Sequence, residues 1–372
     1  MKVLYIGHYK ERGGWSRVAT DNILAMESVG IDVVCRNVTL TRDNPCNDKL
    51  LKLEKKNTKG CDHCVQHVLP HHLVGTNAFK KNVAFLESET TSIKGLGWLE
   101  HLQQMDEVFV ANNQLAASLQ ADGLSPKIRV VPHTCNIENY TQKYPDINVP
   151  QANGKFKFYY IGDLNDRKNI ESIIRCFHSE FDKSEPTILI LKVKKFGMSE
   201  QHVRTYVDKI LSSVKSSLRL YKTLEEYKKD IVISEDLSEE HIYSLHQYAD
   251  CFICPSHGEA WSIPSFDAMA FGKTPICSDF GGPPDFIRQD DPATGECVPG
   301  VYSVCQCSDS AFPDMFTGRE YWFTPCEKSI REQMRYYYEN RNPTEYKIRG
   351  LQQAKKFSYE KVGQRIKELL SE

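Results

Sequence analysis

The chain has 372 residues, which suggests two domains, because single hydrophobic cores rarely grow beyond about 250–300 residues. Its 47 basic and 49 acidic side chains leave a formal net charge of −2, which argues against a nucleic-acid binder with a strongly basic surface. Thirteen cysteines at irregular spacing, with no secretory or membrane-spanning apolar stretch, predict free thiols and a cytoplasmic protein.

Short apolar runs alternate with helix-like segments along the chain, which is typical of α/β folds with parallel sheets. Strands are predicted in the first half at 2–7, 32–36, 83–87, 107–111 and 129–132. Strands are predicted in the second half at 157–161, 187–192, 230–234, 250–254 and 274–278. Helices are predicted between them at 16–28, 168–181, 200–212 and 239–248.

The pattern restarts near the middle of the chain. Residues 148–155 are polar and rich in turn formers, which predicts a linker, and the next strand runs into Gly162 as the first strand runs into Gly7. We therefore expect an α/β fold of two Rossmann-like domains whose parallel sheets face a cleft. The expected domains are residues 1–150 and 151–352, and the amphipathic segment 353–372 is expected to pack back towards the first domain.

Two adjacent glycines, Gly13 and Gly14, follow the first strand and precede the first helix. Glycines at this position let a ligand approach the backbone, and a helix N-terminus favours an anion. The spacing is not the dinucleotide fingerprint G-x-G-x-x-G, so we do not expect a nicotinamide site. A flexible turn without a ligand is the alternative.

A basic pair, Arg167 and Lys168, follows the first strand of the second half. The planar fork of an arginine beside the point charge of a lysine suits a diphosphate. A helix dipole disfavours cations at its start, so an anionic ligand would explain the placement, whereas a solvated pair is the alternative.

Two acids, Glu259 and Asp267, bracket a loop and the start of a short helix that is predicted to open around Pro264 and end at Gly272. Carboxylates accept bidentate hydrogen bonds from vicinal hydroxyls, so a sugar or a ribose is a suitable ligand. The free N–H groups of the first helical turn could hold an anion between them. The alternatives are an ordinary loop acid and a first-turn acid favoured by the helix dipole.

This stretch resembles the signature of retaining nucleotide-sugar glycosyltransferases of the GT-B fold, family four. The signature is a glutamate, seven residues, a second glutamate, a helix of small residues and G-x-P. Here it is Glu259, seven residues and Asp267, followed by the segment 268–275. The resemblance extends over nearly the whole chain, through the basic pair, the glycine loop, Val130 to Thr134 and Gly281 to Asp285.

This sequence differs from the family pattern at three places. The second motif acid is Asp267 where the family has Glu, and Asp163 replaces an arginine after the strand glycine. The family's Gly-Phe-Gly is Ala260, Trp261 and Ser262 here.

The resemblance implies a role for each matched residue. Glu259 would lie near the transferred sugar, Asp267 near the ribose, and Arg167 with Lys168 at the leaving diphosphate. The first domain would bind the acceptor and the second domain the donor. Donor contacts are expected from Gly13, Gly14, Ala260, Trp261, Ser262 and Asp267. In the first domain, Glu89 is expected as a base or acceptor contact, with Glu87 as the alternative.

The predicted function is transfer of a sugar, with retention, from a UDP- or GDP-sugar to a hydroxyl of a glycan or lipid-linked saccharide. No metal and no other cofactor are expected, because two cations and helix N-termini can neutralise the leaving group. The rivals are a sugar phosphorylase or nucleotide-sugar epimerase on the same plan, and a catalytically weak homologue that binds nucleotide sugar as a sensor or assembly subunit.

Two further features have competing interpretations. Cys61 and Cys64 form a C-x-x-C with histidines nearby, but no second pair stands at structural-zinc spacing, so we favour a plain strand and loop over a zinc site. The basic run 49–59 is mildly amphipathic, and we favour a solvated helix over a peripheral membrane contact.

Overall fold

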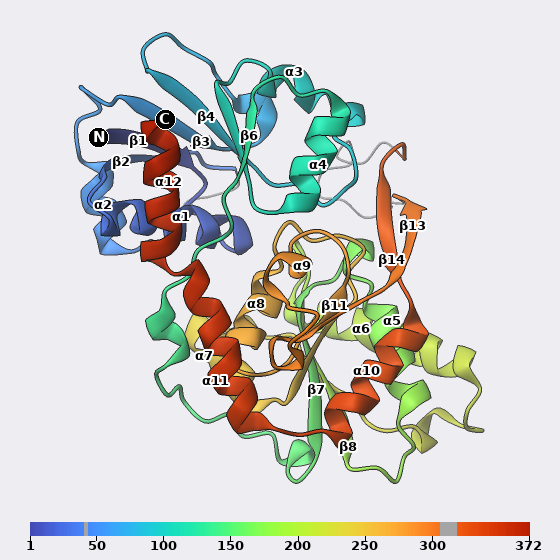
Figure 1. The fold of residues 1–372 in the computed structure, drawn as a ribbon. Helices are drawn as coiled ribbons and strands as arrows, with labels where there is room; N and C mark the ends of the chain where they lie inside the picture. Colours follow the sequence, from blue (N-terminus) through green and yellow to red (C-terminus); the bar gives the residue numbers. More distant parts are fainter. Residues whose placement is uncertain (41–43, 306–317) are drawn as a thin grey trace. The chain divides into compact units, whose positions relative to one another are not determined.

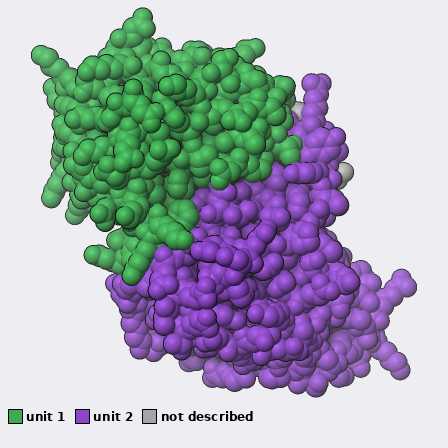
Figure 2. All heavy atoms as spheres, in the orientation of Figure 1, with its two compact units in different colours: residues 1–139, 354–372 green, residues 140–353 purple. Residues whose placement is uncertain are grey.

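The computed structural model describes residues 1–40, 44–305 and 318–372, and the chain divides into two compact units. The first unit comprises residues 1–139 and 354–372, and the second comprises residues 140–353 (Figure 2). The predicted boundary at 150 differs because Tyr140 and Tyr144 pack on the second unit's aromatic residues Phe271 and Tyr243. The predicted linker therefore lies within the second unit.

The first unit is built on a six-stranded parallel sheet, in the order β2-β1-β3-β4-β5-β6. The strands are β1 (Lys2–Gly7), β2 (Asp32–Asn37), β3 (His63–His67), β4 (Lys81–Leu86), β5 (Glu107–Val110) and β6 (Lys127–Val130). The helices are α1 (Gly14–Ser28), α2 (Asp48–Glu54), α3 (Trp98–Leu102), α4 (Asn113–Asp122) and α12 (Tyr359–Ser371).

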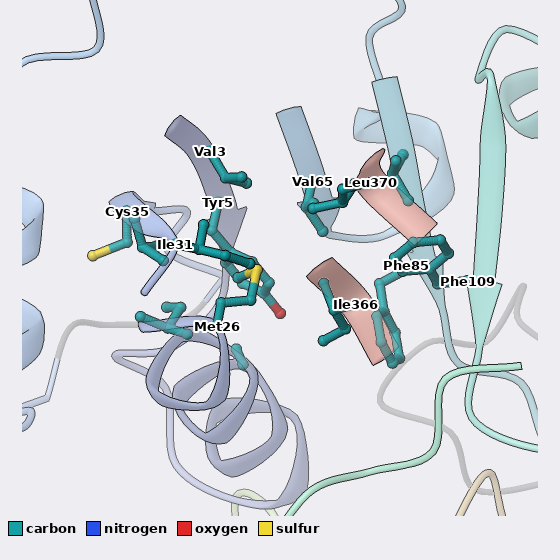
Figure 3. Close-up of a cluster of buried hydrophobic side chains, with 14 of the residues drawn as sticks. Val3, Tyr5, Met26, Ile31, Cys35, Val65, Phe85, Phe109, Ile366 and Leu370 are labelled. Atoms are coloured by element: carbon teal, nitrogen blue, oxygen red, sulfur yellow. The ribbon is translucent and has the colours of Figure 1, made fainter. Parts of the chain in front are cut away.

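One face of this sheet is covered by α1 and α12, which lie side by side (Figure 1). Alternate residues of the strands, such as Val3 and Phe85, meet Met26 of α1 and Ile366 of α12 in one core (Figure 3). The helices approach closely because position 363 is glycine: a Cβ there would lie 2.3 Å from the carbonyl oxygen of Ala25. The end of the chain thus completes the core of the first unit.

The second unit carries another six-stranded parallel sheet, in the order β12-β11-β10-β7-β8-β9. Its strands are β7 (Phe156–Asp163), β8 (Thr187–Lys194), β9 (Ile231–Ile233), β10 (Cys251–Cys254), β11 (Ile276–Ser278) and β12 (Glu296–Val298). A separate antiparallel hairpin is formed by β13 (Gly300–Val304) and β14 (Tyr321–Pro325). The helices are α5 (Ile170–Glu180), α6 (Glu200–Leu218), α7 (Glu239–Tyr248), α8 (Ile263–Ala270), α9 (Pro283–Phe286), α10 (Glu327–Glu339) and α11 (Pro343–Ala354).

Neighbouring residues of β7 show which helices cover each face of this sheet. The Phe158 ring packs on Phe177 and Phe181 around α5, whereas the Tyr159 hydroxyl lies 2.7 Å from Nδ1 of His246 in α7. Successive side chains of a strand point to opposite faces. Helix α5 therefore covers one face and α7 the other, as Figure 1 shows.

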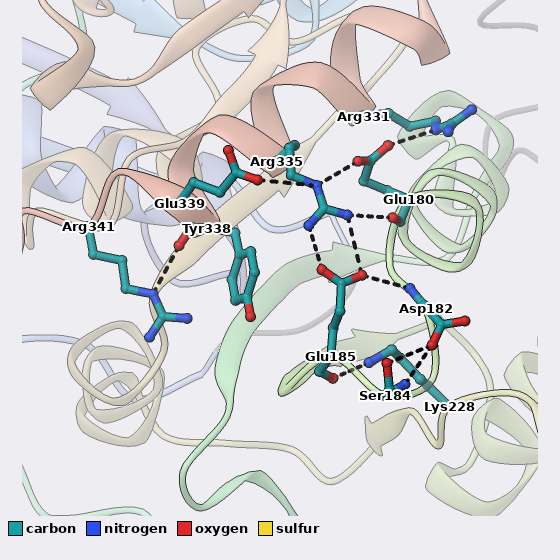
Figure 4. Close-up of polar contacts among 10 residues, drawn as sticks. All are labelled: Glu180, Asp182, Ser184, Glu185, Lys228, Arg331, Arg335, Tyr338, Glu339 and Arg341. Carbon is teal, nitrogen blue, oxygen red and sulfur yellow. Dashed lines mark hydrogen bonds and ion pairs between the residues drawn. The ribbon is translucent and has the colours of Figure 1, made fainter.

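Helix α10 is joined to α5 and the loop after it by the guanidinium of Arg335. This group bonds the carboxylates of Glu180 and Glu185 and lies over the rings of Phe181 and Tyr338 (Figure 4). The two carboxylates raise the pKa of Arg335, so the side chain stays charged. This network lies between helices and has a structural role.

Most predicted elements are present, with several differences. Strand β3 lies where a plain strand and loop were expected beside Cys61 and Cys64, and β12 and the hairpin were not predicted. The helix predicted from 168 begins at Ile170, since Asn169 is left-handed with φ of 52°. The helical part of the closing segment 353–372 is mainly α12, which begins after Ser358, whose side chain accepts from the N–H of Lys361.

Several expectations concern the molecule as a whole. No helix in the described ranges has both the length and the apolar character needed to cross a bilayer. Helix α2 spans only part of the basic run 49–59, and its apolar Leu50 and Leu53 are buried in the core, which leaves a solvated outer face. Each cysteine that the structure describes is a free thiol.

Candidate active site

The loop after β10 carries Glu259, and two glycines hold it in place. The N–H of Gly282 donates a 2.9 Å hydrogen bond to the backbone oxygen of Glu259. A Cβ at Gly281, where φ is 76°, would lie 2.1 Å from that oxygen, and a Cβ at Gly282 would lie 2.4 Å from Cα of Trp261. Only glycine permits this approach, so the segment 281–285 fixes where Glu259 stands.

The basic pair surrounds the Glu259 carboxylate. Lys168 Nζ lies 2.6 Å from Oε1, and Arg167 Nη1 lies 3.5 Å from Oε2. Arg167 Nη1 also donates to the backbone oxygen of Gly258 at 2.5 Å. The carboxylate side chain is 9% exposed and the two cationic side chains 15% and 17%, so the three groups form a compact, largely buried cluster.

The loop after β7 is joined to the loop after β10 through its backbone. The carbonyl of Arg167 accepts hydrogen bonds from the N–H of His257 at 2.7 Å and the hydroxyl of Ser256 at 3.0 Å. The left-handed Asn169 donates its side-chain amide to the carbonyl of Pro255 at 3.0 Å. These bonds hold the two cations against Glu259 at the carboxyl ends of adjacent strands, where open α/β sheets bind ligands.

Two opposing effects set the charge of Glu259. Burial alone would raise its pKa, but Lys168 and Arg167 more than offset this, so the pKa lies below its ordinary value. The cluster therefore has three fixed charges with a net charge of +1 at neutral pH. A diphosphate that approached the two cations would find donors already oriented by Glu259.

Asp267 does not join this cluster of charges. It lies in α8, is 1% exposed, and its Oδ1 accepts a 2.7 Å hydrogen bond from the hydroxyl of Tyr140. Helix α8 has Pro264 in its first turn, no acidic residue there, and a left-handed N-cap residue, Ser262, with φ of 69°. The N-terminus of α8 thus adds positive potential beside the Glu259 loop, and the ribose role of Asp267 stays a prediction.

The three residues between Glu259 and α8 are held by packing. Trp261 is 2% exposed, and its ring packs on Phe266 and Phe286. Ser262 bonds the hydroxyl of Ser265 at 2.6 Å. A bulky tryptophan therefore fills the core, and any donor contact from Ala260 to Ser262 would have to come mainly from the backbone.

In the first unit, Gly13 precedes α1 with φ of 112°, a conformation that suits glycine. No side chain caps this N-terminus through a hydrogen bond, and its first turn holds no acidic residue. The turn after β1 therefore has the features that favour an anion, as the sequence predicted. The donor contact of Gly13 and Gly14 remains a prediction.

A second cluster lies at the carboxyl ends of strands in the first unit. Glu87 Oε1 lies 2.6 Å from His133 Nε2 and 3.8 Å from His67 Nε2. His67 Nδ1 lies 2.9 Å from the hydroxyl of Tyr5, and its ring meets the edge of Trp15. His67 and His133 were missed from the sequence, although each stands at or just after a predicted strand, as ligand-contacting residues of such folds do.

Glu87, the alternative predicted from the sequence, belongs to this polar cluster, and a catalytic role of Glu89 stays a prediction. Glu89 lies two residues further along the loop and is partly exposed. Burial lowers the pKa of His67 to about 4, with the nearby Glu87 acting in the opposite direction. His67 is thus neutral at physiological pH and can both donate and accept a hydrogen bond.

Cys61 and Cys64 belong to an apolar cluster with Leu4 and Val34. Burial raises the pKa of Cys64 to about 12, which disfavours the thiolate that zinc binds. Within the described residues, no group of three or more His, Cys, Asp or Glu side chains is arranged to hold a metal ion.

Comparisons with known proteins place this geometry in context. Residues 146–304 match the family model described as glycosyl transferases group 1. No curated protein matches the chain in sequence.

Solved structures share the fold at low sequence identity. A sucrose-phosphate synthase from Thermosynechococcus elongatus has a TM-score of 0.68 at 14% identity, over 100% of this chain and 98% of that one. A UDP-forming α,α-trehalose-phosphate synthase from Burkholderia xenovorans, solved with glucose-6-phosphate, has a TM-score of 0.67 at 8% identity, over 100% of both chains. A glycosyltransferase from Rickettsia africae has a TM-score of 0.65 at 11% identity, over 99% of this chain and 97% of that one. Residues 146–304 thus match the glycosyl transferases of group 1, and the chain as a whole has the two-domain GT-B fold.

Proposed function

We propose that this protein transfers a sugar from a nucleoside diphosphate sugar to an acceptor hydroxyl, with retention of the anomeric configuration. The observation that carries the proposal is the buried cluster of Glu259, Lys168 and Arg167, which lies inside the family match. The two cations would bind the diphosphate, and Glu259 would orient them and face the transferred sugar.

In the proposed reaction, the bond between the anomeric carbon and the phosphate oxygen breaks, and its electron pair leaves with the nucleoside diphosphate. The acceptor oxygen attacks the same face, and its proton passes to the departing phosphate. Lys168 and Arg167 stabilise the charge that develops on that phosphate, a contribution that is typically worth about 3–4 kcal/mol per group in comparable sites. Two fixed cations and the N-terminus of α8 support a metal-independent reaction.

We propose a carbohydrate acceptor, a glycan or a lipid-linked saccharide, bound by the first unit. The cluster of Glu87, His67 and His133 offers both acceptors and donors for sugar hydroxyls. Among similar structures, one was solved with glucose-6-phosphate, which supports a carbohydrate acceptor.

The test is a transfer assay with UDP- and GDP-sugars against a panel of oligosaccharide and lipid-linked acceptors, in buffer with EDTA. Product formation with the donor's anomeric configuration, read by NMR, is expected, and Glu259→Gln is expected to remove most of it. Inversion of configuration, or activity that requires an added divalent metal, would contradict the mechanism. Nucleotide binding without transfer to any acceptor would favour the sensor or assembly role instead.

A further inference from the structure

A buried lysine, Lys192, lies near the carboxyl end of β8. It is 4% exposed, and no hydrogen bond or ion pair joins its ammonium to any residue in the described ranges. Burial lowers its pKa, an effect to which the nearby Lys194 adds. The Lys192 Nζ is not among the side-chain nitrogens that are closed off from solvent without a partner, so the buried stem carries the ammonium to the surface at the sheet edge. A cation held by a buried stem at a ligand-binding edge, without a fixed ion-pair partner in the described ranges, is placed to meet a ligand.

The sheet register locates Lys192 relative to the candidate active site. Lys192 is level with Ile161 of β7, two residues after Tyr159, whose side chain contacts α7. Lys192 therefore projects from the α7 face of the sheet. Strand β8 is two strands from β10, and adjacent strands are about 4.8 Å apart, so Lys192 lies roughly 10 Å along the edge from the end of β10.

The surroundings of Lys192 combine donors and acceptors of hydrogen bonds. The acids Asp163, Glu235 and Asp236 are close enough to raise its pKa, although none forms an ion pair with it. Asp163 instead pairs with Lys194 at 4.0 Å. An ammonium beside carboxylates is complementary to a ligand edge on which a carbonyl oxygen stands next to an N–H group.

We infer that Lys192 reads the nucleobase of the donor and selects uracil or guanine. The inference rests on the proposed function: with the diphosphate at Lys168 and Arg167, a nucleoside that extends along the sheet edge reaches the position of Lys192. Uracil and guanine present a carbonyl oxygen beside a ring N–H. Adenine and cytosine present an amino donor beside a ring nitrogen, which would face the ammonium with the wrong group.

The test is isothermal titration of the full chain with UDP, GDP, ADP, CDP and inorganic pyrophosphate. The variants are Lys192→Met, which keeps the length of the side chain without its charge, and the control Lys194→Met, on the same strand but half exposed. Wild type is expected to prefer UDP or GDP. Lys192→Met should weaken the preferred nucleotide about tenfold or more while ADP, CDP and pyrophosphate change little.

Two outcomes would contradict only the inference about Lys192, and a third would also contradict the proposed function. If Lys192→Met weakens pyrophosphate as much as the nucleotides, the lysine binds the diphosphate and not the base. If wild type prefers ADP or CDP, the assignment of the base is wrong. If wild type binds no nucleotide, the proposed function fails and this inference with it. Circular dichroism shows whether Lys192→Met is folded. A folding defect would weaken all five ligands, whereas loss of base recognition would weaken only the preferred nucleotide.

Discussion

The hydroxyl of Tyr140 donates a 2.7 Å hydrogen bond to Oδ1 of Asp267, and both residues are 1% exposed. The tyrosine ring packs edge-on against Phe266, which precedes Asp267 in α8, and against Phe271, the residue after α8. The shortened acid of the sugar-transferase motif is therefore held from outside its own helix. This contact brings the start of the second unit onto the helix that follows Glu259.

Removing this hydrogen bond should destabilise the second unit. Tyr140→Phe is expected to lower the free energy of unfolding by about 1.5–3 kcal/mol, the usual range for a buried hydrogen bond to a charged group. Urea denaturation gives the value, and Tyr336→Phe, at an exposed tyrosine of α10, is the matched control with little expected change. Equal stabilities of the two variants would show that the bond contributes nothing.

Burial of His67 should make stability depend on pH. Its pKa is about 4 in the folded chain against 6.5 in the unfolded chain, so the unfolded state binds more protons between these values. Its contribution is complete above pH 6.5 and is lost as the pH falls towards 4, by about 3 kcal/mol in total. The free energy of unfolding should decrease from pH 7.5 to pH 4.5, and this decrease should be smaller in His67→Gln than in wild type. An identical fall would mean that His67 is not buried as a neutral group.

Much of the fold could be predicted from the sequence because long apolar runs such as β7 and β8 alternate with helical patterns. The basic pair and Glu259 could also be found, since each follows a predicted strand. The partner of Asp267 could not, because Tyr140 is 127 residues away in sequence. Lys192 escaped notice because it ends an apolar run, although a charge within a strand that is buried on both faces is itself a signal.

The role of Trp261 shows a limit of motif comparison. Its place between Glu259 and Asp267 suggested a donor contact, but its side chain packs on Phe266 and Phe286 in the core. The ring is 2% exposed, so the predicted donor contact of Trp261, which stays a prediction, would come mainly from its backbone. Only the three-dimensional packing separates a residue that touches a ligand from one that supports the loop.

The close approach of α1 and α12 should depend on Gly363. A Cβ there would meet the backbone oxygen of Ala25, which cannot move without shifting α1, so Gly363→Ala is expected to cost about 1–3 kcal/mol of stability. Gln364→Ala, on the solvated side of α12, is the control and should change stability by less than about 0.5 kcal/mol. Thermal denaturation measures the stability of both variants. A stability of Gly363→Ala equal to that of wild type would show that the two helices can move apart at little cost.

The two acids after β4 should differ in their effect on the acceptor. Glu87→Gln weakens the hydrogen bond to His133 and is expected to raise the acceptor KM about tenfold, while the donor KM changes little. Glu89→Gln should have a smaller effect, because Glu87 holds the 2.6 Å hydrogen bond to His133. Initial rates at varied acceptor concentration test this. A larger effect of Glu89→Gln would restore Glu89 as the principal acceptor contact.

Lys168 and Arg167 are proposed to bind a nucleoside diphosphate beside Glu259. The most direct measurement is the thermal stability of wild type, Lys168→Ala and the exposed control Lys328→Ala with and without UDP and GDP. A ligand at about 100 times its Kd should add about 2.7 kcal/mol of stability. A rise in Tm is expected for wild type and for Lys328→Ala, and Lys168→Ala should largely lose it. A rise of equal size in Lys168→Ala, or none in folded wild type, would contradict the proposed binding.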